Sequence, residues 1–543
     1  MRSAHLDSFV RDRLPPPEAQ PEFLFDLPEL RYPERLNAAS ALIDAGSADA
    51  PAVINDGGTW SYGDLRRLSD GIARLLVEEE GLVPGNRVLL RGPNGAMLFA
   101  AWLGVLKAGG ILVTTMPLLR AGELATLIER AQVHHAIVDE RCLEDFLAAA
   151  DETALIRSLL TYRGDAGGGR LEQRLEASAP GFRAVDTHRD DVAMIAFTSG
   201  TTGKPKGCIH FHRDLLASAD SFARRLLEPR ADDRWLCSAP IAFTFGLGMS
   251  LTFPWRFGGA AITVEQASPK AMLGAAARHR ATILATAPTA YKAMLAMHGG
   301  HDLGALRTCV SAGEHLPAAT WTAWRDATGL AIVDGIGATE MMHIFISAAG
   351  DAIRPGATGR AVPGYRACVL DPNGKPILHA PGRLAVKGPT GCRYFDDPRQ
   401  AAYVQGGWNL TGDTYREDED GYFWYVARSD DMIVSSGYNI AAPEVENALY
   451  AHPAVAECAV IGVPCEERGQ RVKAFVIVAA GHDPGPALAR ALQDHVKATI
   501  APYKYPREVE FVAALPRTAT GKLQRFALRE APAAGPTGAS PRT

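Results

Sequence analysis

The densest chemical signal in the sequence is a run of glycine, hydroxyl and lysine residues at 198–207 (TSGTTGKPKG). It follows an apolar stretch, residues 192–197, that is typical of a buried strand. Glycines let the backbone approach a ligand closely, hydroxyls can donate to phosphate oxygens, and lysines supply positive charge. The run therefore predicts a polyphosphate-binding loop that uses Thr198, Ser199, Gly200, Thr201, Thr202, Gly203, Lys204 and Lys206.

The main alternative for this run is the Walker A loop, G-x-x-x-x-G-K-[ST]. Only two residues separate Gly200 from Gly203, and Pro205 follows Lys204 where a serine or threonine would stand. The spacing therefore argues against a P-loop NTPase. A flexible surface turn stays an alternative for the segment taken by itself.

Further motifs follow the loop in a fixed order. They are SAGE at 311–314, DGIGATE at 334–340, TGD at 411–413, RSDD at 428–431 and PRTATGK at 516–522. This ordered set resembles the adenylate-forming superfamily of acyl- and aryl-CoA synthetases, adenylation domains and luciferases, over residues 60–525. Within it the sequence resembles the benzoate-CoA ligase branch, and segments 23–36 and 208–227 are most similar to 2-aminobenzoate (anthranilate) CoA ligases.

The resemblance implies a two-step reaction that uses ATP, Mg²⁺ and coenzyme A. A carboxylate attacks the α-phosphate of ATP, and the acyl adenylate then passes its acyl group to the thiol of coenzyme A. By resemblance, the loop at 198–207 holds the β- and γ-phosphates, Thr339 contacts the α-phosphate and Glu340 binds Mg²⁺. Lys522 would bridge the carboxylate and α-phosphate oxygens, so positioning and electrostatics would do most of the catalysis.

The resemblance also implies the nucleoside contacts. Asp413 is expected to accept from the ribose diol, and Arg428 to contact the ribose or a phosphate. The residues that would frame the adenine are Gly313, Glu314, Asp334, Gly335 and Ile336. Ile336 stands where family members often carry an aromatic residue, so stacking on the adenine is an open question.

Each of these residues also has a purely structural alternative. Asp413 could belong to a turn after Gly412, Arg428 could pair with the acids at 417–420, and Glu314 could be solvated. An isolated Lys522 would be an ordinary surface lysine, but its place in the PRTATGK motif favours the catalytic role.

The segment 242–248 (AFTFGLG) places two aromatic rings among small residues, which suits a flat apolar ring better than a long chain. His343 adds a polar group: if a helix begins near Thr339, His343 lies three residues after Glu340 on the same face. A structural position is the alternative for this histidine. We expect the substrate pocket to be lined by Phe243, Phe245, Gly246, Ala312, Gly337, Met341, His343 and Ile344.

The order of elements predicts an α/β fold, since short aliphatic runs alternate with helical patterns and favour largely parallel strands. We expect a large N-terminal domain of several subdomains at 1–429, a small mobile α+β domain at 430–530, and a disordered tail at 531–543. Lys522 cannot stay over the phosphates while a thiol reaches the carbonyl, so the small domain should rotate about a hinge at Asp430. Gly437 would then help to line the channel for the pantetheine arm of coenzyme A.

The composition sets wider limits. The 543 residues carry a formal net charge of −5, which gives no broad basic footprint for a nucleic acid. Residues 1–17 lack the apolar stretch of a secretory signal, and no apolar run reaches the roughly 20 residues that span a membrane. We therefore expect a cytoplasmic protein that binds a small aromatic carboxylic acid and neither nucleic acid nor membrane.

The favoured prediction is an AMP-forming aryl-CoA ligase acting on 2-aminobenzoate or benzoate. One alternative is a free-standing adenylation enzyme that loads a carrier protein, so an acyl carrier protein or a downstream acyltransferase stays open as a partner. The other is a nucleotide-binding scaffold without catalysis. Retention of Thr339, Glu340, Asp413 and Lys522 argues against that scaffold.

Overall fold

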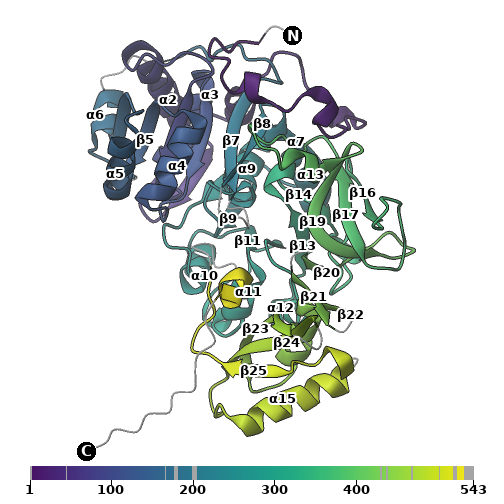
Figure 1. Cartoon of the computed structure of the whole chain (residues 1–543). Helices are drawn as coiled ribbons and strands as arrows, with labels where there is room; N and C mark the ends of the chain where they lie inside the picture. The colour runs from purple at the N-terminus through teal and green to yellow at the C-terminus, as the bar shows by residue number, and fades with distance from the viewer. Residues whose placement is uncertain are drawn as a thin grey trace, which may run out of the picture. The chain divides into compact units, whose positions relative to one another are not determined.

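The chain divides into two compact units in the computed structural model, shown in Figure 1. The structure describes residues 3–44, 46–164, 167–176, 181–198, 205–428, 431–435, 438–465, 469–500, 502–517 and 523–530. Unit 1 is formed by residues up to 379, 384–411 and 417–424, and unit 2 by residues 380–383, 412–416 and from 425 onward. Asp430 and the tail at 531–543 lie outside the described residues, so the hinge and the domain limits stay predictions.

The first sheet of unit 1 has six strands in the order β6-β5-β3-β4-β7-β8. All neighbouring strands are parallel except β7 and β8, which form an antiparallel pair. Their near-continuous aliphatic sequences are those of parallel strands covered on both faces. The strands are β3 (Arg87–Arg91), β4 (Ile111–Thr115), β5 (His135–Asp139), β6 (Ser158–Tyr162), β7 (Val192–Thr198) and β8 (Lys206–Phe211).

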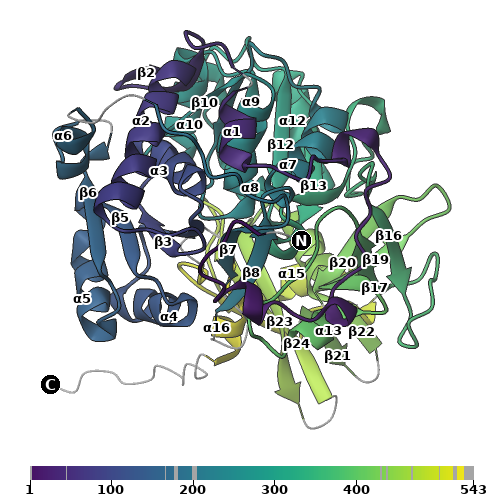
Figure 2. The ribbon, with the colours of Figure 1, turned by 90° about the horizontal axis from the view of Figure 1, so that it is seen from above.

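Alternate residues of this sheet reach opposite faces, as the period of a strand requires. Val88 and Leu90 of β3 join the core beneath α2 and α3, whereas Leu89 joins the core beneath α4 and α5. Figure 2 shows these two helix layers on either side of the sheet. No helix in the described ranges is both long and apolar enough to cross a membrane. The covering helices are α2 (Tyr62–Arg74), α3 (Ala96–Lys107), α4 (Ala121–Ala131) and α5 (Leu143–Thr153).

The second sheet of unit 1 has nine strands in the order β15-β14-β13-β12-β11-β9-β10-β1-β2. The six from β13 to β1 are parallel, and antiparallel strands close both edges. Helices α10, α11 and α12 contribute Met272, Tyr291 and Trp324 to the core that the sheet also lines. The elements are β1 (Pro51–Asn55), β2 (Gly58–Ser61), β9 (Arg234–Cys237), β10 (Ala260–Ile262), β11 (Ile283–Thr286), β12 (Thr308–Ala312), β13 (Ile332–Gly337), β14 (Ile344–Ser347), β15 (Arg360–Ala361), α10 (Pro269–Arg278), α11 (Pro288–Leu295) and α12 (Ala318–Thr328).

A third sheet follows in the chain, with the order β16-β17-β19-β18 and β20 paired with β19. Its strands are β16 (Arg366–Leu370), β17 (Gly382–Lys387), β18 (Val404–Gln405), β19 (Trp408–Glu417) and β20 (Phe423–Arg428).

Unit 2 contains its own small sheet, β22-β21-β24-β23 with β25 on β24. Val445 and Leu449 of α14, and Leu492 and Val496 of α15, share an apolar core with the strands. Together with the layered unit 1, this arrangement confirms the predicted α/β fold class with a large and a small part. The elements are β21 (Met432–Ser435), β22 (Tyr438–Ala441), β23 (Val455–Cys465), β24 (Gly469–Val478), β25 (Glu508–Phe511), α14 (Ala442–Tyr450) and α15 (Pro486–Thr499).

Candidate active site

The predicted phosphate loop lies at the tip of the β7–β8 hairpin. Thr198 ends β7 and pairs with Lys206, which begins β8. The hairpin therefore holds the two ends of the loop close together. Ser199, Gly200, Thr201, Thr202, Gly203 and Lys204 lie outside the described residues, so their phosphate contacts stay a prediction.

Glu340 lies in a short 3₁₀ turn, Thr339–Met341, that follows β13. The expectation of a longer helix from Thr339 is wrong: Met342 takes a positive φ of 67° and the chain continues into β14. His343 therefore does not share a helical face with Glu340. The Glu340 side chain is instead buried, next to Tyr394.

The carboxylate of Glu340 has a buried hydrogen bond. The hydroxyl of Tyr394 donates to Glu340 Oε1 at 2.5 Å, and Lys206 Nζ donates to that hydroxyl at 3.3 Å. Burial raises the pKa of Glu340, and the nearby Cys208 adds to this rise, while the Tyr394 hydrogen bond opposes it. Burial also raises the pKa of Tyr394, so its phenol stays protonated and acts as the donor.

The donor set at Glu340 fits a magnesium ion that is shared with a nucleotide. Mg²⁺ is usually held by one or two carboxylates together with substrate phosphates and water. The described residues contain no group of three or more His, Cys, Asp or Glu side chains suited to a metal ion. A buried carboxylate near Lys206, where the predicted phosphate loop ends, is thus compatible with a Mg²⁺ ion that the phosphates of ATP also bind.

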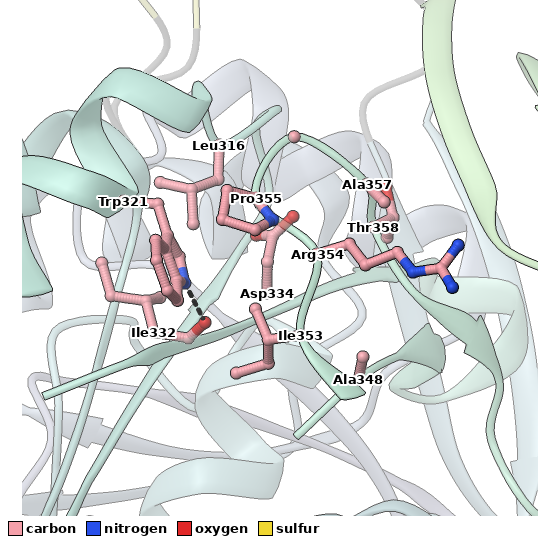
Figure 3. Close-up of a pocket in the computed structure, with 11 residues that line it drawn as sticks. Leu316, Trp321, Ile332, Asp334, Ala348, Ile353, Arg354, Pro355, Ala357 and Thr358 are labelled. Carbon is pink, nitrogen blue, oxygen red and sulfur yellow. Dashed lines mark hydrogen bonds between the residues drawn. The ribbon is translucent and has the colours of Figure 1, made fainter. Parts of the chain in front are cut away.

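Asp334 lies in β13, in register with Ser311 of β12. Its Oδ1 atom is buried without a hydrogen-bond partner among the described residues, and burial raises its pKa to about 7. Figure 3 shows this carboxylate beside Pro355. Both residues line a cavity with a volume of about 10 Å³. Such an oxygen can accept a hydrogen bond, but the cavity beside it has room for about one water molecule, so the contact of Asp334 with an adenine stays a prediction.

The raised pKa of Asp334 should make the stability of the protein depend on pH. Its rise from 3.8 to about 7 means that ionisation lowers the free energy of unfolding between these pH values, by up to about 4 kcal/mol. Asp334→Asn removes this loss, so we expect the ligand-free variant to melt at a higher temperature than the wild type. The difference should grow with pH from about pH 4 and level off above about pH 7. Thermal melts over that pH range test this, and a difference that is constant with pH would contradict the assignment.

His343 lies inside a box of three phenylalanine rings. The ring centroids of Phe222, Phe245 and Phe253 are 5.5, 5.5 and 4.5 Å from that of the imidazole. The side chain of His343 is 2% exposed, and neither ring nitrogen has a hydrogen-bond partner among the described residues. Burial lowers its pKa to about 3; the neighbouring backbone of Phe245 opposes this shift without forming a hydrogen bond of normal geometry. The imidazole is therefore neutral and has an unused acceptor nitrogen.

Gly248 determines how much room the imidazole has. It begins the π-helical segment η8 (Gly248–Thr252), and a Cβ atom there would lie 2.4 Å from His343 Cδ2. Real Cβ contacts are never this short, so any side chain at Gly248 would displace His343. The two residues thus form one shaped wall of the aromatic box.

The remaining predicted lining residues fall into two groups. Gly246 is in α8 (Thr244–Leu247), directly before η8, and Phe243 caps that helix. Strand pairing brings Ala312 opposite Gly335 and Gly337 opposite Ile344, so these small and aliphatic residues lie side by side. Met341 is fully buried in the turn beside Glu340. Contacts thus join Phe245 with His343 and Gly337 with the backbone of His343, and a shared pocket with Phe243 and Ala312 stays a prediction.

The structure describes only some of the residues that were predicted to contact the nucleoside or to act in catalysis. Gly313 has a φ of 92°, with open space where a Cβ would lie, and Ile336 and Glu314 are partly exposed. Asp413, which is partly exposed, and Arg428 belong to unit 2, in β19 and β20. Gly437 and Lys522 lie outside the described residues. The nucleoside and catalytic roles of these residues therefore stay predictions.

Sequence reasoning missed three side chains of this region. Phe222 belongs to the π-helical segment η7 (Ala219–Leu227), Phe253 opens α9 (Phe253–Arg256), and Tyr394 follows the third sheet's strand β17. None of them belongs to a recognisable motif. The aromatic character of the sequence around 243–257 was the one signal that could have indicated Phe253.

Comparisons with known proteins agree with this geometry. The model of the AMP-binding enzyme family matches residues 42–394, and that of the AMP-binding enzyme C-terminal domain matches residues 444–522. A benzoate–CoA ligase from Thauera aromatica is 37% identical over 93% of this chain and 98% of its own. A crystal structure of an anthranilate CoA ligase in complex with anthranoyl-AMP has a TM-score of 0.88 at 34% identity, and covers 93% of this chain and 98% of that one. A benzoate CoA ligase from Burkholderia xenovorans LB400 has a TM-score of 0.83 at 33% identity, and covers 91% and 100%.

The fold and these matches define the class: the chain belongs to the AMP-binding, adenylate-forming enzyme family. Within that family it belongs to the benzoate–CoA ligase branch. Both points confirm the resemblance read from the sequence motifs.

Proposed function

We propose that this protein is an ATP-dependent, AMP-forming aryl-CoA ligase. The observation that carries the proposal is the aromatic box around a neutral His343, close in the fold to the turn that bears Glu340. Apolar rings bind a flat aromatic acid, and a long alkyl chain would need a tunnel instead. The benzoate and anthranilate CoA ligases among the relatives support the same substrate class.

The proposed reaction has two steps, each with its own demand on the protein. In the first, a carboxylate oxygen of the acid bonds to the α-phosphorus of ATP, and pyrophosphate leaves. In the second, the thiol of coenzyme A attacks the carbonyl of the aryl adenylate, and AMP leaves. Thr339 would contact the α-phosphate, and Asp413 the ribose. Lys522 would neutralise charge between the two reacting groups in the first step.

Mg²⁺ would be held by Glu340 together with the phosphates of ATP, and would neutralise part of their charge. The residues of this chain do the remaining work. The β7–β8 hairpin fixes the ends of the phosphate loop, and Lys206 is held by Tyr394 beside that loop. Rotation of the small domain about Asp430 would exchange Lys522 for the pantetheine channel near Gly437 between the steps.

We further propose that 2-aminobenzoate is preferred over benzoate. An ortho amino group brings a donor into the pocket, and a buried donor is costly unless it finds an acceptor. A neutral imidazole offers one such acceptor, and the ring nitrogens of His343 have no partner among the described residues. Benzoate would still be accepted, because an apolar pocket discriminates only modestly among rings of similar shape.

The experiment that tests the function is acid-dependent ATP–pyrophosphate exchange over a panel of acids. We expect exchange with 2-aminobenzoate and benzoate, weaker exchange with 4-substituted benzoates, and none with octanoate or longer acids. Faster exchange with octanoate than with benzoate would refute the aryl assignment. Thioester formation with free coenzyme A, and not only with a carrier protein, separates a ligase from a free-standing adenylation enzyme.

His343→Ala tests how the amine is recognised. We expect kcat/KM for 2-aminobenzoate to fall about 5- to 50-fold more than kcat/KM for benzoate, since benzoate has no amine to satisfy. Phe222→Leu is the control, because it alters the same box and keeps the acceptor nitrogen of His343. It should lower kcat/KM for both acids by similar factors. Equal losses on both acids in His343→Ala would show that His343 shapes the pocket without contacting the amine.

A further inference from the structure

Tyr394 lies where three parts of the candidate site meet. Its hydroxyl donates to Glu340 Oε1 at 2.5 Å and accepts from Lys206 Nζ at 3.3 Å. Its backbone forms an antiparallel bridge with Cys208 of β8, the strand that leaves the phosphate loop. One residue thus connects the phosphate-loop strand, the lysine at its start and the turn that carries Glu340.

The backbone on both sides of Tyr394 is fixed by buried contacts. Gln400 Oε1 accepts from the amide of Tyr394 at 2.8 Å, and the amide of Phe395 donates to the carbonyl of Gly207 at 2.8 Å. Arg393 is fully buried and pairs with Asp214 at 2.8 Å. The backbone that carries the phenol of Tyr394 is therefore held in place. The phenol can in turn hold in place the group to which it hydrogen-bonds.

Glu340 needs such support more than most carboxylates. It lies in a short turn, and a free glutamate side chain loses rotamer freedom when it binds a ligand. A short hydrogen bond from a hydroxyl to a carboxylate is among the stronger kinds. If that bond already orients Glu340, the free energy of cation binding no longer has to offset this loss of side-chain entropy.

We propose that Tyr394 is a positioning residue, which holds the carboxylate of Glu340 in place before Mg²⁺ and ATP bind. This inference rests on the proposed function, in which Glu340 is the magnesium ligand. It assigns Tyr394 to the adenylation step alone, because pyrophosphate and its cation have left before the thiol attacks.

Tyr394→Phe removes the hydroxyl and keeps the ring. We expect the Kd of Mn²⁺, measured by electron paramagnetic resonance with a non-hydrolysable ATP analogue, to rise about tenfold. The Mg²⁺ concentration for half-maximal ATP–pyrophosphate exchange should rise by a similar factor. Thioester formation from a supplied aryl adenylate should stay within about twofold of the wild type.

Tyr403→Phe is the matched control, since its ring lies 5.6 Å from that of Tyr394 in the same small cluster. It should bind Mn²⁺ like the wild type. The Glu340→Gln variant adds a second test: in that background Tyr394→Phe should cause little further loss of Mn²⁺ affinity, because the two residues act as one. Wild-type Mn²⁺ affinity in Tyr394→Phe, equal loss of both half-reactions, or additive losses in the double variant would overturn the proposal.

The metal-binding measurement needs no aromatic acid. If wild-type protein binds Mn²⁺ with the nucleotide analogue but shows no exchange with any aromatic acid, the proposed function fails while the role of Tyr394 is still decided. If exchange occurs and Tyr394→Phe binds Mn²⁺ normally, the role of Tyr394 fails and the proposed function stands.

Discussion

Lys522→Ala should lower the rate of ATP–pyrophosphate exchange by about 10²- to 10³-fold. In the proposed reaction, Lys522 supplies positive charge at the point where the carboxylate attacks phosphorus, and that charge has no role once the adenylate exists. Thioester formation from a chemically prepared 2-aminobenzoyl adenylate should therefore stay within about twofold of the wild type. The two half-reactions are measured separately by rapid quench.

Lys497→Ala provides the control for this variant. Lys497 lies on α15 in unit 2 and pairs with Asp494 at the surface, so its loss should leave both half-reactions unchanged. If Lys522→Ala slows both half-reactions equally, Lys522 does not act on the adenylation step in particular, and the assignment from the PRTATGK motif fails.

Glu340→Gln should lower exchange at saturating ATP by about 10²-fold. Glutamine keeps the shape of the side chain and an oxygen that can accept from Tyr394, but it loses the negative charge. A neutral amide oxygen is a weaker ligand for a hard divalent cation than a carboxylate. The Mg²⁺ dependence of exchange, measured as an initial rate over a range of Mg²⁺ concentrations, should shift to higher concentrations.

Glu152→Gln, which neutralises an exposed carboxylate in α5, should leave this Mg²⁺ dependence unchanged. An unaltered Mg²⁺ dependence in Glu340→Gln would show that the cation binds elsewhere. The inference about Tyr394 would then lose its premise, although the hydrogen bond to Glu340 would remain a structural fact.

Much of the fold could be predicted from local sequence. The apolar run at 192–197 predicted a strand and lies in β7 (Val192–Thr198), and α14 has Pro443 in its first turn. Continuous aliphatic runs indicate such strands, and a proline in the first turn indicates the start of such a helix. The order of strands was not predictable in this way: β9 lies between β11 and β10 because of long-range packing, which no local pattern records.

The candidate site was predictable where a motif exists and not elsewhere. Phe245 and His343 were expected to share a pocket, and their rings are in contact. The proposed reason was wrong, since the backbone turns at Met342 instead of continuing a helix. Phe222 and Tyr394 come from segments far away in the sequence. Only the packing of η7 brings Phe222 to His343, and only the buried backbone contacts around Tyr394 bring its hydroxyl to Glu340.

The central claim, that this protein joins an aromatic acid to coenzyme A through an adenylate, is tested most directly by its products. Protein, ATP, Mg²⁺, coenzyme A and 2-aminobenzoate are incubated together, and AMP, ADP and the thioester are quantified by liquid chromatography and mass spectrometry. We predict 2-aminobenzoyl-CoA and AMP in equal amounts, no ADP, and a smaller yield of benzoyl-CoA when benzoate replaces 2-aminobenzoate. Formation of ADP, or the absence of any aryl thioester with either acid, would contradict the account.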